Sequence, residues 1–342
     1  MIKLPPSTSI KSIQYDLFSQ FITNNQKEVS NSVEMWDAIP KYFLTAKQQK
    51  QLRTSTGHAD PYEWAYHYKS VGCMVKIQPA LIKQNNGKYK AFFPNVTEEL
   101  VEEALKKILT DQQYGIHDPT KAETWIKFSL SMVQKKLKAR GRGRSIDEIK
   151  HAIEVMSRCN LTLYREGKEV WNGAILQDLV TVDRKAYKED GGSLHAARLP
   201  LFISQAINCL DYRQHNHNRL MSCDNQLARW LLRTKLIPRF TQASLFTSYN
   251  ILYSELKQSG LLQQAREIDN RLKVNKAFDE LVKRDVLMQW SGTVHMNGRI
   301  IVDVKYEMSP SVKFSGEQKA ANKRLNDGHS KAIRLGLVPV DK

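Results

Sequence analysis

The chain has 342 residues, a formal net charge of +17 at pH 7 and a sequence pI of about 9.6. Its hydrophobic fraction of 41% excludes a wholly disordered chain, the length suggests two domains with terminal extensions, and no apolar run is long enough to span a membrane. The basic excess favours a polyanionic partner, with nucleic acid ahead of an anionic membrane surface.

The N-terminal region, residues 1 to about 60, is predicted to be loosely structured. It holds a short helix near Ser12–Ile22 and a polar stretch over Thr45–Asp60. It lacks the apolar segment and cleavage signal of a secreted protein, so we expect a cytoplasmic location. The region is either a partner-binding arm or a small extension packed on the first domain.

A β-hairpin is predicted over residues 73–93. Alternation in Cys73–Ile77 favours a strand, Gln84–Gly87 supplies a turn, and Tyr89–Phe93 returns. A helix then opens near Thr97 with acidic residues in its first turn, as the helix dipole favours. Its apolar face at helical spacing consists of Leu100, Val101, Ala104, Leu105 and Ile108.

The next stretch has the order of a winged helix-turn-helix. A strand over Trp125–Phe128 is followed by a helix that Ser129 caps and by a glycine-rich turn. Ser145 with Glu148 has the capping-box pattern and opens a second helix. Two strands follow, over Leu161–Tyr164 and Val170–Val182, joined by a short polar loop.

A similar order recurs after a predicted strand over Leu194–Leu199 and a helix over Pro200–Ile207. Asn297-Gly298 is a strong hairpin signal between the last two strands. From Ser315 onward we expect a basic tail that is either helical or disordered. The expected helices of this second winged helix are Gln226–Leu232, Leu245–Leu256 and Glu267–Lys283, and the expected strands are Val286–Trp290 and Ile300–Tyr306.

The first group of candidate DNA-binding residues lies around the glycine-rich turn. Six of the ten residues from 135 to 144 are basic, and they fall between two predicted helices. In a helix-turn-helix such cations neutralise phosphates, and the glycines allow close backbone approach. The competing interpretation is a solvated basic turn that binds nothing. The group consists of Lys135, Lys136, Lys138, Arg140, Arg142, Arg144 and, in the following helix, Lys150.

The second group lies on the polar side of a recognition helix that begins near Gln263. Arginine suits guanine, asparagine suits adenine, and lysine suits phosphate or guanine. An ordinary charged helix face, paired internally through Glu267, Asp269 and Glu280, explains the same pattern equally well. The group consists of Arg266, Asn270, Arg271, Lys273 and Lys276.

The segment Arg213–Arg219 contains His215 and His217, which invites a metal or nickase interpretation. A histidine-based nickase wants bulky apolar neighbours and a nearby tyrosine, whereas asparagines flank this pair. We therefore predict a polar loop or surface strand, and no metal site.

Enzymatic signatures are missing from the sequence. It has no GxxxxGK[ST] phosphate loop, no GxSxG elbow and no spaced carboxylates of a two-metal site. Its four cysteines are scattered without CxxC spacing, as expected for reduced thiols in a cytosolic protein. We expect a binding protein without catalytic residues or cofactors.

The chain resembles plasmid replication initiator (Rep) proteins with two tandem winged-helix domains. The similarity covers about residues 70 to 325 and lies in the order of several short motifs. These are Met74–Ala80, Phe93-Pro94 with Glu98–Leu105, Ile126–Leu130 with the turn Gly141–Ser145, Tyr212–Gln214 with Leu227–Leu231, and Ala277–Leu281 leading to Val286–Trp290.

The resemblance implies specific partners. Such initiators bind origin repeats (iterons) as monomers, help to open an adjacent AT-rich segment, and recruit the host initiator and replicative helicase. Many also form homodimers through the first winged helix and repress their own gene. For this chain it implies double-stranded origin DNA as the ligand, a role in plasmid copy control, and a place at the nucleoid or plasmid.

The sequence as a whole predicts an α+β fold with two tandem winged-helix domains. The predicted divisions are an N-terminal extension (1–69), a first winged helix for DNA contact and dimerisation (70–210), a second for iteron recognition (211–314) and a basic tail (315–342). Two alternatives stay open. One is a winged-helix transcriptional regulator without a replication role, and the other is a nicking or priming enzyme.

Overall fold

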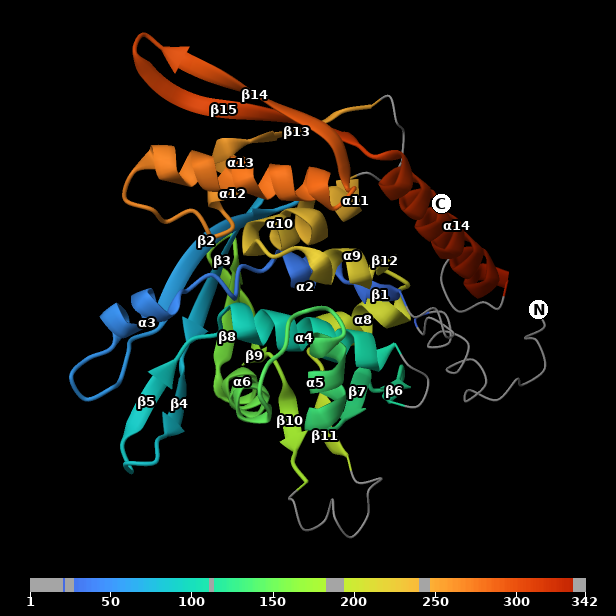
Figure 1. The fold of residues 1–342 in the computed structure, drawn as a ribbon. Coiled ribbons are helices and arrows are strands. Elements are labelled where there is room, and N and C mark those ends of the chain that lie inside the picture. Colours follow the sequence, from blue (N-terminus) through green and yellow to red (C-terminus); the bar gives the residue numbers. More distant parts are fainter. Residues whose placement is uncertain (1–20, 22–27, 111–113, 183–193, 240–246, 335–342) are drawn as a thin grey trace.

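The computed structural model describes residue 21 and residues 28–110, 114–182, 194–239 and 247–334 (Figure 1). The fold is mixed α/β and contains several open antiparallel sheets. No helix in these ranges is both long and apolar enough to cross a membrane. The helix expected near Ser12–Ile22 lies outside the described residues, apart from Phe21, as do residues 335–342 of the tail.

The N-terminal region is part of the core from residue 29 onward. It forms β1 (Val29–Ser32), α2 (Glu34–Ala38) and α3 (Ala46–Leu52). Trp36 is fully buried, the Gln226 amide donates to the Tyr42 carbonyl oxygen at 2.8 Å, and the Phe43 ring packs on the backbone of Gly260. The prediction of a loose region was therefore wrong for residues 29–52, because apolar side chains of this segment fill the space between distant parts of the chain.

One sheet has the order β2-β3-β8-β9 (β2, Tyr62–Tyr68; β3, Val71–Gln78; β8, Asn160–Arg165; β9, Lys168–Ala174). The boundary predicted at 69/70 falls in the tight β2–β3 turn, where Lys69 and Ser70 both have positive φ. The predicted β8–β9 hairpin is confirmed, and it turns at Glu166-Gly167, also with positive φ.

The hairpin predicted over residues 73–93 was right in its turn and wrong in its first strand. β3 pairs with β2 and β8, and the hairpin is instead made by β4 (Ala80–Lys83) and β5 (Tyr89–Phe92). β2 and β8 pair with β3 over most of its length, whereas β5, the strand predicted as its partner, has only four residues. Pro79 separates β3 from β4.

A second sheet has the order β10-β11-β7-β6 (β6, Gly115–Asp118; β7, Glu123–Phe128; β10, Gln177–Val180; β11, His195–Arg198). The strand expected over 170–182 is split into β9 and β10, which belong to different sheets, with Ile175 and Leu176 buried between them. Because β7 pairs with β11 and β6 and not with the β8–β9 hairpin, the structure does not confirm a simple three-stranded winged helix in residues 70–210.

Several helices in the described ranges accompany these sheets. They are α4 (Val96–Leu109), α5 (Leu130–Lys138), α6 (Ile146–Arg158) and α8 (Leu201–Asn208). α4 contacts both α5 and α6, and Figure 1 shows it crossing the middle of the molecule. The apolar face predicted for α4 is confirmed, since its five residues are all buried.

The second half begins with β12 (Arg213–Asn216), which pairs with β1, and α9 (His217–Ser222). α10 (Gln226–Leu231) continues through a π-helical turn, η1 (Leu232–Leu236), into α11 (Ile237–Arg239). β13 (Tyr249–Leu252), α12 (Tyr253–Lys257), α13 (Glu267–Lys283), β14 (Leu287–Asn297) and β15 (Ile300–Pro310) follow. The helix at 267–283 and the hairpin at Asn297-Gly298 are confirmed.

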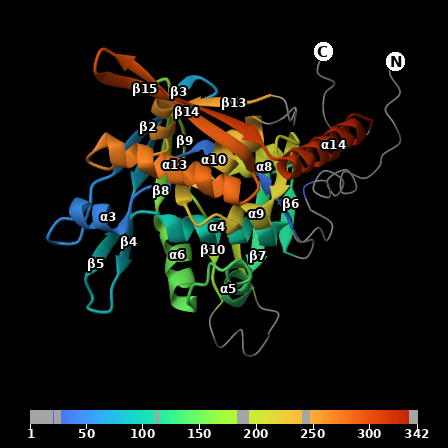
Figure 2. The same ribbon diagram turned by 45° about the horizontal axis from the view of Figure 1, so that its top comes forward.

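The helix predicted over Leu245–Leu256 was wrong for residues 249–252. This segment is β13, which pairs with β15 and completes the sheet β13-β15-β14. Ile251 is buried against the sheet, so the available β15 edge overrides the local helical pattern. In Figure 2, α13 lies beside this sheet and next to α10, and both contacts are present in the structure.

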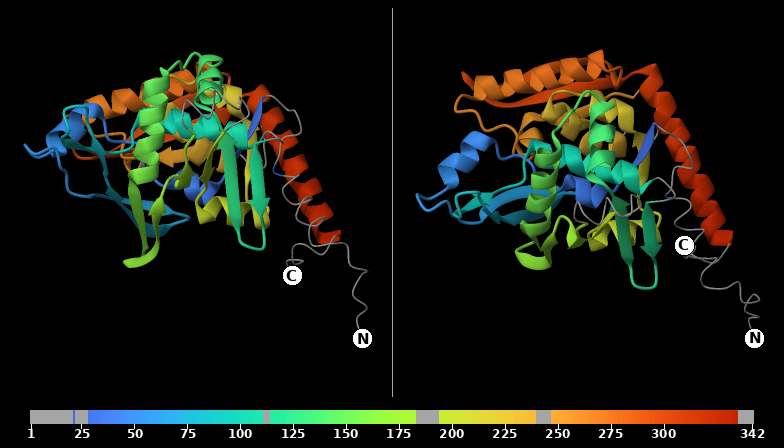
Figure 3. Two further views of the ribbon diagram at one scale, coloured as in Figure 1. Left: turned by 90° about the horizontal axis from the view of Figure 1, so that it is seen from below. Right: turned by 60° about the horizontal axis from the view of Figure 1, so that its bottom comes forward.

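The tail is helical from residue 312, as one of the two expectations had it. α14 (Val312–Arg334) runs along one side of the molecule, which both views of Figure 3 show. The Glu317 carboxylate accepts hydrogen bonds from the Arg219 guanidinium at 2.8 Å and from the Asn216 side-chain amide at 3.0 Å. These bonds place α14 against β12 and α9.

Buried ion pairs join α4 to the second half of the chain. Arg229 of α10 pairs with Glu99 at 2.9 Å, and Arg233 of η1 pairs with Glu103 at 3.0 Å. Lys106 binds both Glu103 (3.1 Å) and Asp37 of α2 (2.5 Å). All these side chains are less than a tenth exposed, so the pairs exclude water and depend on one another.

Candidate nucleic-acid interface

The helix-turn-helix at α5 and α6 is set by local chemistry. The Ser129 hydroxyl accepts from the Met132 amide at the start of α5, and Ser145 with Glu148 forms the predicted capping box of α6. Between them, the Arg142 amide donates to the Leu137 carbonyl and the Gly141 amide to that of Lys138. This is the bond pattern of a Schellman motif, and the positive φ of Gly141 explains the glycine.

The cations at the end of α5, in the turn and at the start of α6 are exposed or half-buried, and none is fully buried. Lys135, Lys138 and Lys150 are exposed, and Lys136, Arg140, Arg142 and Arg144 are half-buried. Val133 and Leu137 bury the opposite side of α5. Among the described residues, no acidic side chain forms an ion pair with Lys135, Lys138, Arg140 or Arg144. The guanidinium groups of Arg140 and Arg144 bond backbone carbonyls next to them, which leaves donors available.

Arg142 has a different role from its neighbours. Its Nε donates to the Met221 carbonyl oxygen at 3.1 Å, and its guanidinium pairs with Asp224. The hydrogen bond from Arg142 holds the pKa of the Asp224 carboxyl below its usual value. Asp224 also binds Arg284, at the end of α13, at 3.1 Å. Arg142, Asp224 and Arg284 therefore connect the turn between α5 and α6 to the C-terminal end of α13.

The exposed edge of α6 is mixed in charge. Asp147, Glu148 and Lys150 face solvent near its start, and Glu154 pairs with Arg158 at 3.0 Å near its end. The other sides of α6 contact α4, α5 and the β4 strand. Phosphate binding at this helix-turn-helix would therefore fall on the turn and the end of α5 more than on α6.

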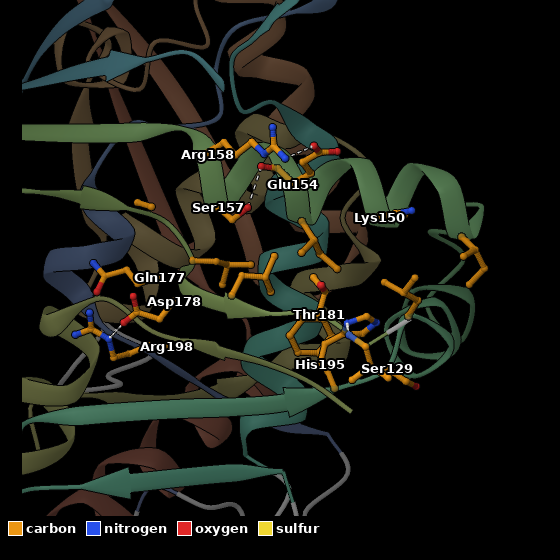
Figure 4. Close-up of a pocket in the computed structure, with 18 of the residues that line it drawn as sticks. Ser129, Lys150, Glu154, Ser157, Arg158, Gln177, Asp178, Thr181, His195 and Arg198 are labelled. Carbon is orange, nitrogen blue, oxygen red and sulfur yellow. Dashed lines mark hydrogen bonds and ion pairs between the residues drawn. The ribbon is translucent and has the colours of Figure 1, made fainter. Parts of the chain in front are cut away.

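A hollow of about 1930 Å³ lies between α6 and strands β9–β11, and Figure 4 shows its lining. Two ion pairs lie in its lining: Arg198 with Asp178, and Glu154 with Arg158. Burial lowers the pKa of His195, and Lys150 lowers it further; the ring Nδ1 accepts from the Val182 amide at 3.0 Å. The charged groups of the hollow mostly neutralise one another.

α13 presents fewer of its predicted residues than expected. Arg266 and Lys276 are exposed, and Arg266 pairs with Asp269 at 2.9 Å. Arg271 is half-buried. The Lys273 ammonium donates to the Leu261 carbonyl oxygen at 2.7 Å, and burial lowers its pKa.

The inclusion of Asn270 among the base-reading candidates needs correction. It is only 2% exposed, its Oδ1 accepts from the Gln264 amide at 2.9 Å, and its Nδ2 donates to the Gln264 carbonyl. Both ends of the side-chain amide are thus used by the loop that precedes α13. Asn270 fixes the approach to the helix and does not face a ligand. Its position in the sequence gave no sign of this, because the bonded loop has no strong motif.

We expect Asn270→Ala to destabilise the protein without changing which DNA sequence it prefers. The change removes two part-buried hydrogen bonds to the Gln264 backbone, each contributing about 0.5–1.5 kcal/mol. Urea unfolding followed by binding to a randomised duplex pool measures both effects. Arg271→Ala is the matched comparison on the same helix, and we expect it to alter preference with little loss of stability. A changed preference in the Asn270 variant alone would contradict the assignment.

Sequence reasoning missed two groups that the structure brings to this region. Asp224 and Arg284 connect the α5–α6 turn to α13, and no local sequence motif marks either residue. The β14–β15 hairpin extends from the molecule (Figure 1), with Arg299 and several apolar side chains exposed near its tip. Asn297-Gly298 located this hairpin but said nothing of its exposed side chains. The exposed apolar residues of the hairpin include Val294, Met296, Ile300 and Val302.

No protein-family model matches the chain, and no curated protein sequence matches it. Its fold is similar to that of several solved structures, among them the following three. Two are structures of domains 2 and 3 of RctB, with TM-scores of 0.47 and 0.44 and identities of 11% and 13%. They cover 82% and 80% of this chain and 99% and 98% of their own. The third is the Pi initiator protein in complex with iteron DNA, with a TM-score of 0.35, 14% identity, and coverage of 84% of this chain and 99% of that one.

Proposed function

We propose that this chain is a sequence-specific duplex DNA-binding protein that initiates replication at repeated origin sites. The observation that carries the proposal is a group of cations at the end of α5 and in the turn after it, which we call the basic turn (Lys135, Lys138, Arg140 and Arg144). Within the part of the chain that the structure describes, none of the four forms an ion pair with a carboxylate. Cations held on a helix-turn-helix in this way suit contact with phosphates.

The second half supplies the proposed reading element. α13 follows a short helix and precedes a long hairpin, and β13 joins the hairpin as the third strand of the sheet. We propose that residues 211–314 form a winged helix with α13 as the recognition helix. We also propose that residues 70–210 form a second winged helix, in which β7 and the β8–β9 hairpin belong to different sheets.

The connection through Asp224 bears on how both units meet DNA. Since Arg142 and Arg284 bind the same carboxylate, the basic turn and the end of α13 have a set separation. This contact holds only the C-terminal end of α13 beside the turn, whereas Arg266 and Arg271 lie toward the other end of the helix. We propose that the turn and that other end of α13 contact successive major grooves of one duplex. The role in replication is supported by the sequence resemblance to Rep initiators. Pi, a structural neighbour, is bound to iteron DNA in its solved structure, the class of ligand proposed here.

Footprinting of the full chain on DNA that flanks its own gene tests the proposal. We expect protection at several direct repeats, each extending over two major grooves, and permanganate reactivity in an adjacent AT-rich segment. Protection of a single groove would contradict the two-element mode. A lone protected palindrome without melting would identify a transcriptional regulator.

We propose further that the chain acts on DNA without cleaving it. Incubation with supercoiled origin DNA and Mg²⁺ or Mn²⁺ should then yield no nicked circles. Nicked product that disappears in an inactive variant would favour the nicking-enzyme alternative.

A further inference from the structure

Two histidines and a glutamate meet in the interior of the protein, next to α9, whose Met221 carbonyl accepts a hydrogen bond from Arg142. His215 lies on β12, His217 begins α9, and Glu103 lies on α4. They are 4%, 2% and 1% exposed. One nitrogen of each imidazole and one carboxylate oxygen all lie within 4.8 Å of one another. The prediction of a polar loop or surface strand was therefore right about the strand for His215 only, since His217 is helical, and wrong about the surface for both.

Polar atoms in this cluster lack hydrogen-bond partners among the described residues. They are both ring nitrogens of His215, Nδ1 of His217 and Oε2 of Glu103. The hydroxyl of Ser30, which lies directly across the β1–β12 ribbon from His215, is also unpaired. Buried polar atoms are nearly always bonded, so several unsatisfied ones in one place indicate a missing occupant.

We propose that Glu103, His215 and His217 bind a zinc ion. Two imidazoles and a carboxylate are a known ligand set for Zn²⁺, with the fourth position held by water. Nitrogen donors in a buried site favour zinc over Mg²⁺ or Ca²⁺, which prefer oxygen donors. Tetrahedral ligands at about 2.0–2.2 Å from the metal are about 3.4 Å apart, so small side-chain rotations would close the observed cluster.

The surroundings orient the ligands. Oε1 of Glu103 accepts from Arg233 at 3.0 Å and from Lys106 at 3.1 Å, which leaves Oε2 directed elsewhere. Such outer contacts commonly fix a metal-binding carboxylate. Because Arg233 and Lys106 already bind the Glu103 carboxylate, we expect the two imidazoles to contribute most of the affinity for zinc.

Occupation of the site would connect three parts of the fold. The ion would join α4 to β12 and the start of α9, beside the β1 strand of the N-terminal region. This goes beyond the proposed function, since none of the three residues belongs to the basic turn or to α13. Zinc would act as a structural group whose binding free energy adds to folding.

The test begins with the full chain stripped of metal by a chelator and titrated with Co²⁺ and Zn²⁺. We expect one Co²⁺ per chain with the visible absorption of a tetrahedral site, displacement of that ion by Zn²⁺, and a Zn²⁺-dependent rise in Tm. His215→Asn with His217→Asn should lose the Co²⁺ signal and the rise in Tm. The matched control removes two exposed histidines, by His58→Asn with His67→Asn, and should keep both.

X-ray absorption of the zinc-loaded wild type decides the case even where the double variant fails to fold. We expect scattering from two imidazoles and low-Z ligands only. Sulfur ligands from the free cysteines, no stoichiometric binding by the wild type, or unchanged binding by the folded double variant would each overturn the proposal.

Discussion

Replacement of Arg229 by alanine is expected to lower the free energy of unfolding by about 3–5 kcal/mol, because the buried Glu99 carboxylate loses its nearest cation and keeps only Arg233, at 3.5 Å. Arg229 and Glu99 are 1% and 2% exposed, so water cannot substitute for the guanidinium. The same guanidinium also bonds the carbonyl oxygens of Cys223 and Asp224 at 2.9 and 3.1 Å. The loss therefore combines a weakened buried charge pair with two unsatisfied acceptors. Urea unfolding monitored by circular dichroism measures it.

Arg158→Ala is the matched control, since it removes an arginine from an exposed pair with Glu154. Exposed pairs contribute about 0–1 kcal/mol. The double change Arg229→Met with Glu99→Met should recover much of the loss, because it removes both charges of the pair together, while Arg233 keeps its ion pair with Glu103. If Arg229→Ala were no more harmful than Arg158→Ala, the described interior pairing would be wrong.

The two sides of α4 show what local sequence predicts and what it cannot. Helical spacing identified the buried apolar face. Glu99 and Glu103 look like solvent-facing residues by the same spacing, yet both are buried. Their partners Arg229 and Arg233 lie 130 residues away in the chain, and nothing near Glu99 in the sequence indicates them.

Turns and caps were predictable because their causes are short-range. Ser145 with Glu148, Glu166-Gly167 and Asn297-Gly298 each act within a few residues, and the structure has all three. Strand pairing was harder, since β3 pairs with β8 across more than eighty residues and its alternation alone does not name a partner. β13 was predicted as a helix for the same reason.

The candidate site divides in the same way. The basic turn is contiguous, so its position was evident from sequence, but the attachment of Arg142 to Asp224 depends on where α9 ends. The asparagines beside His215 suggested solvent. Burial there comes from the pairing of β12 with β1 and from α14, which packs against β12. Polar composition near a residue therefore says little about its burial when distant elements cover it.

Removal of the basic turn is expected to weaken binding to every duplex by about 10²–10³-fold near physiological salt, if each of four side chains contacts a phosphate. The variant is Lys135→Ala, Lys138→Ala, Arg140→Ala and Arg144→Ala. Arg142 is left in place because its bonds to Met221 and Asp224 are internal. The slope of log K against log salt should become shallower by about 0.9 for each phosphate that the variant no longer neutralises. Fluorescence anisotropy over a salt series gives both values.

A general loss of positive charge would also weaken binding, so the control must remove the same charge elsewhere. Lys47, Lys50, Lys83 and Lys88 are exposed on α3 and the β4–β5 hairpin, away from the turn. Their replacement by alanine changes the net charge equally, and we expect it to lower affinity far less, because phosphate contacts release counterions only where they form. Equal losses in the two variants would mean that the protein's overall field attracts DNA and that the turn has no particular place in binding. A steeper loss at the turn, with the preferred sequence unchanged, would assign phosphate contact to α5 and leave base reading to α13.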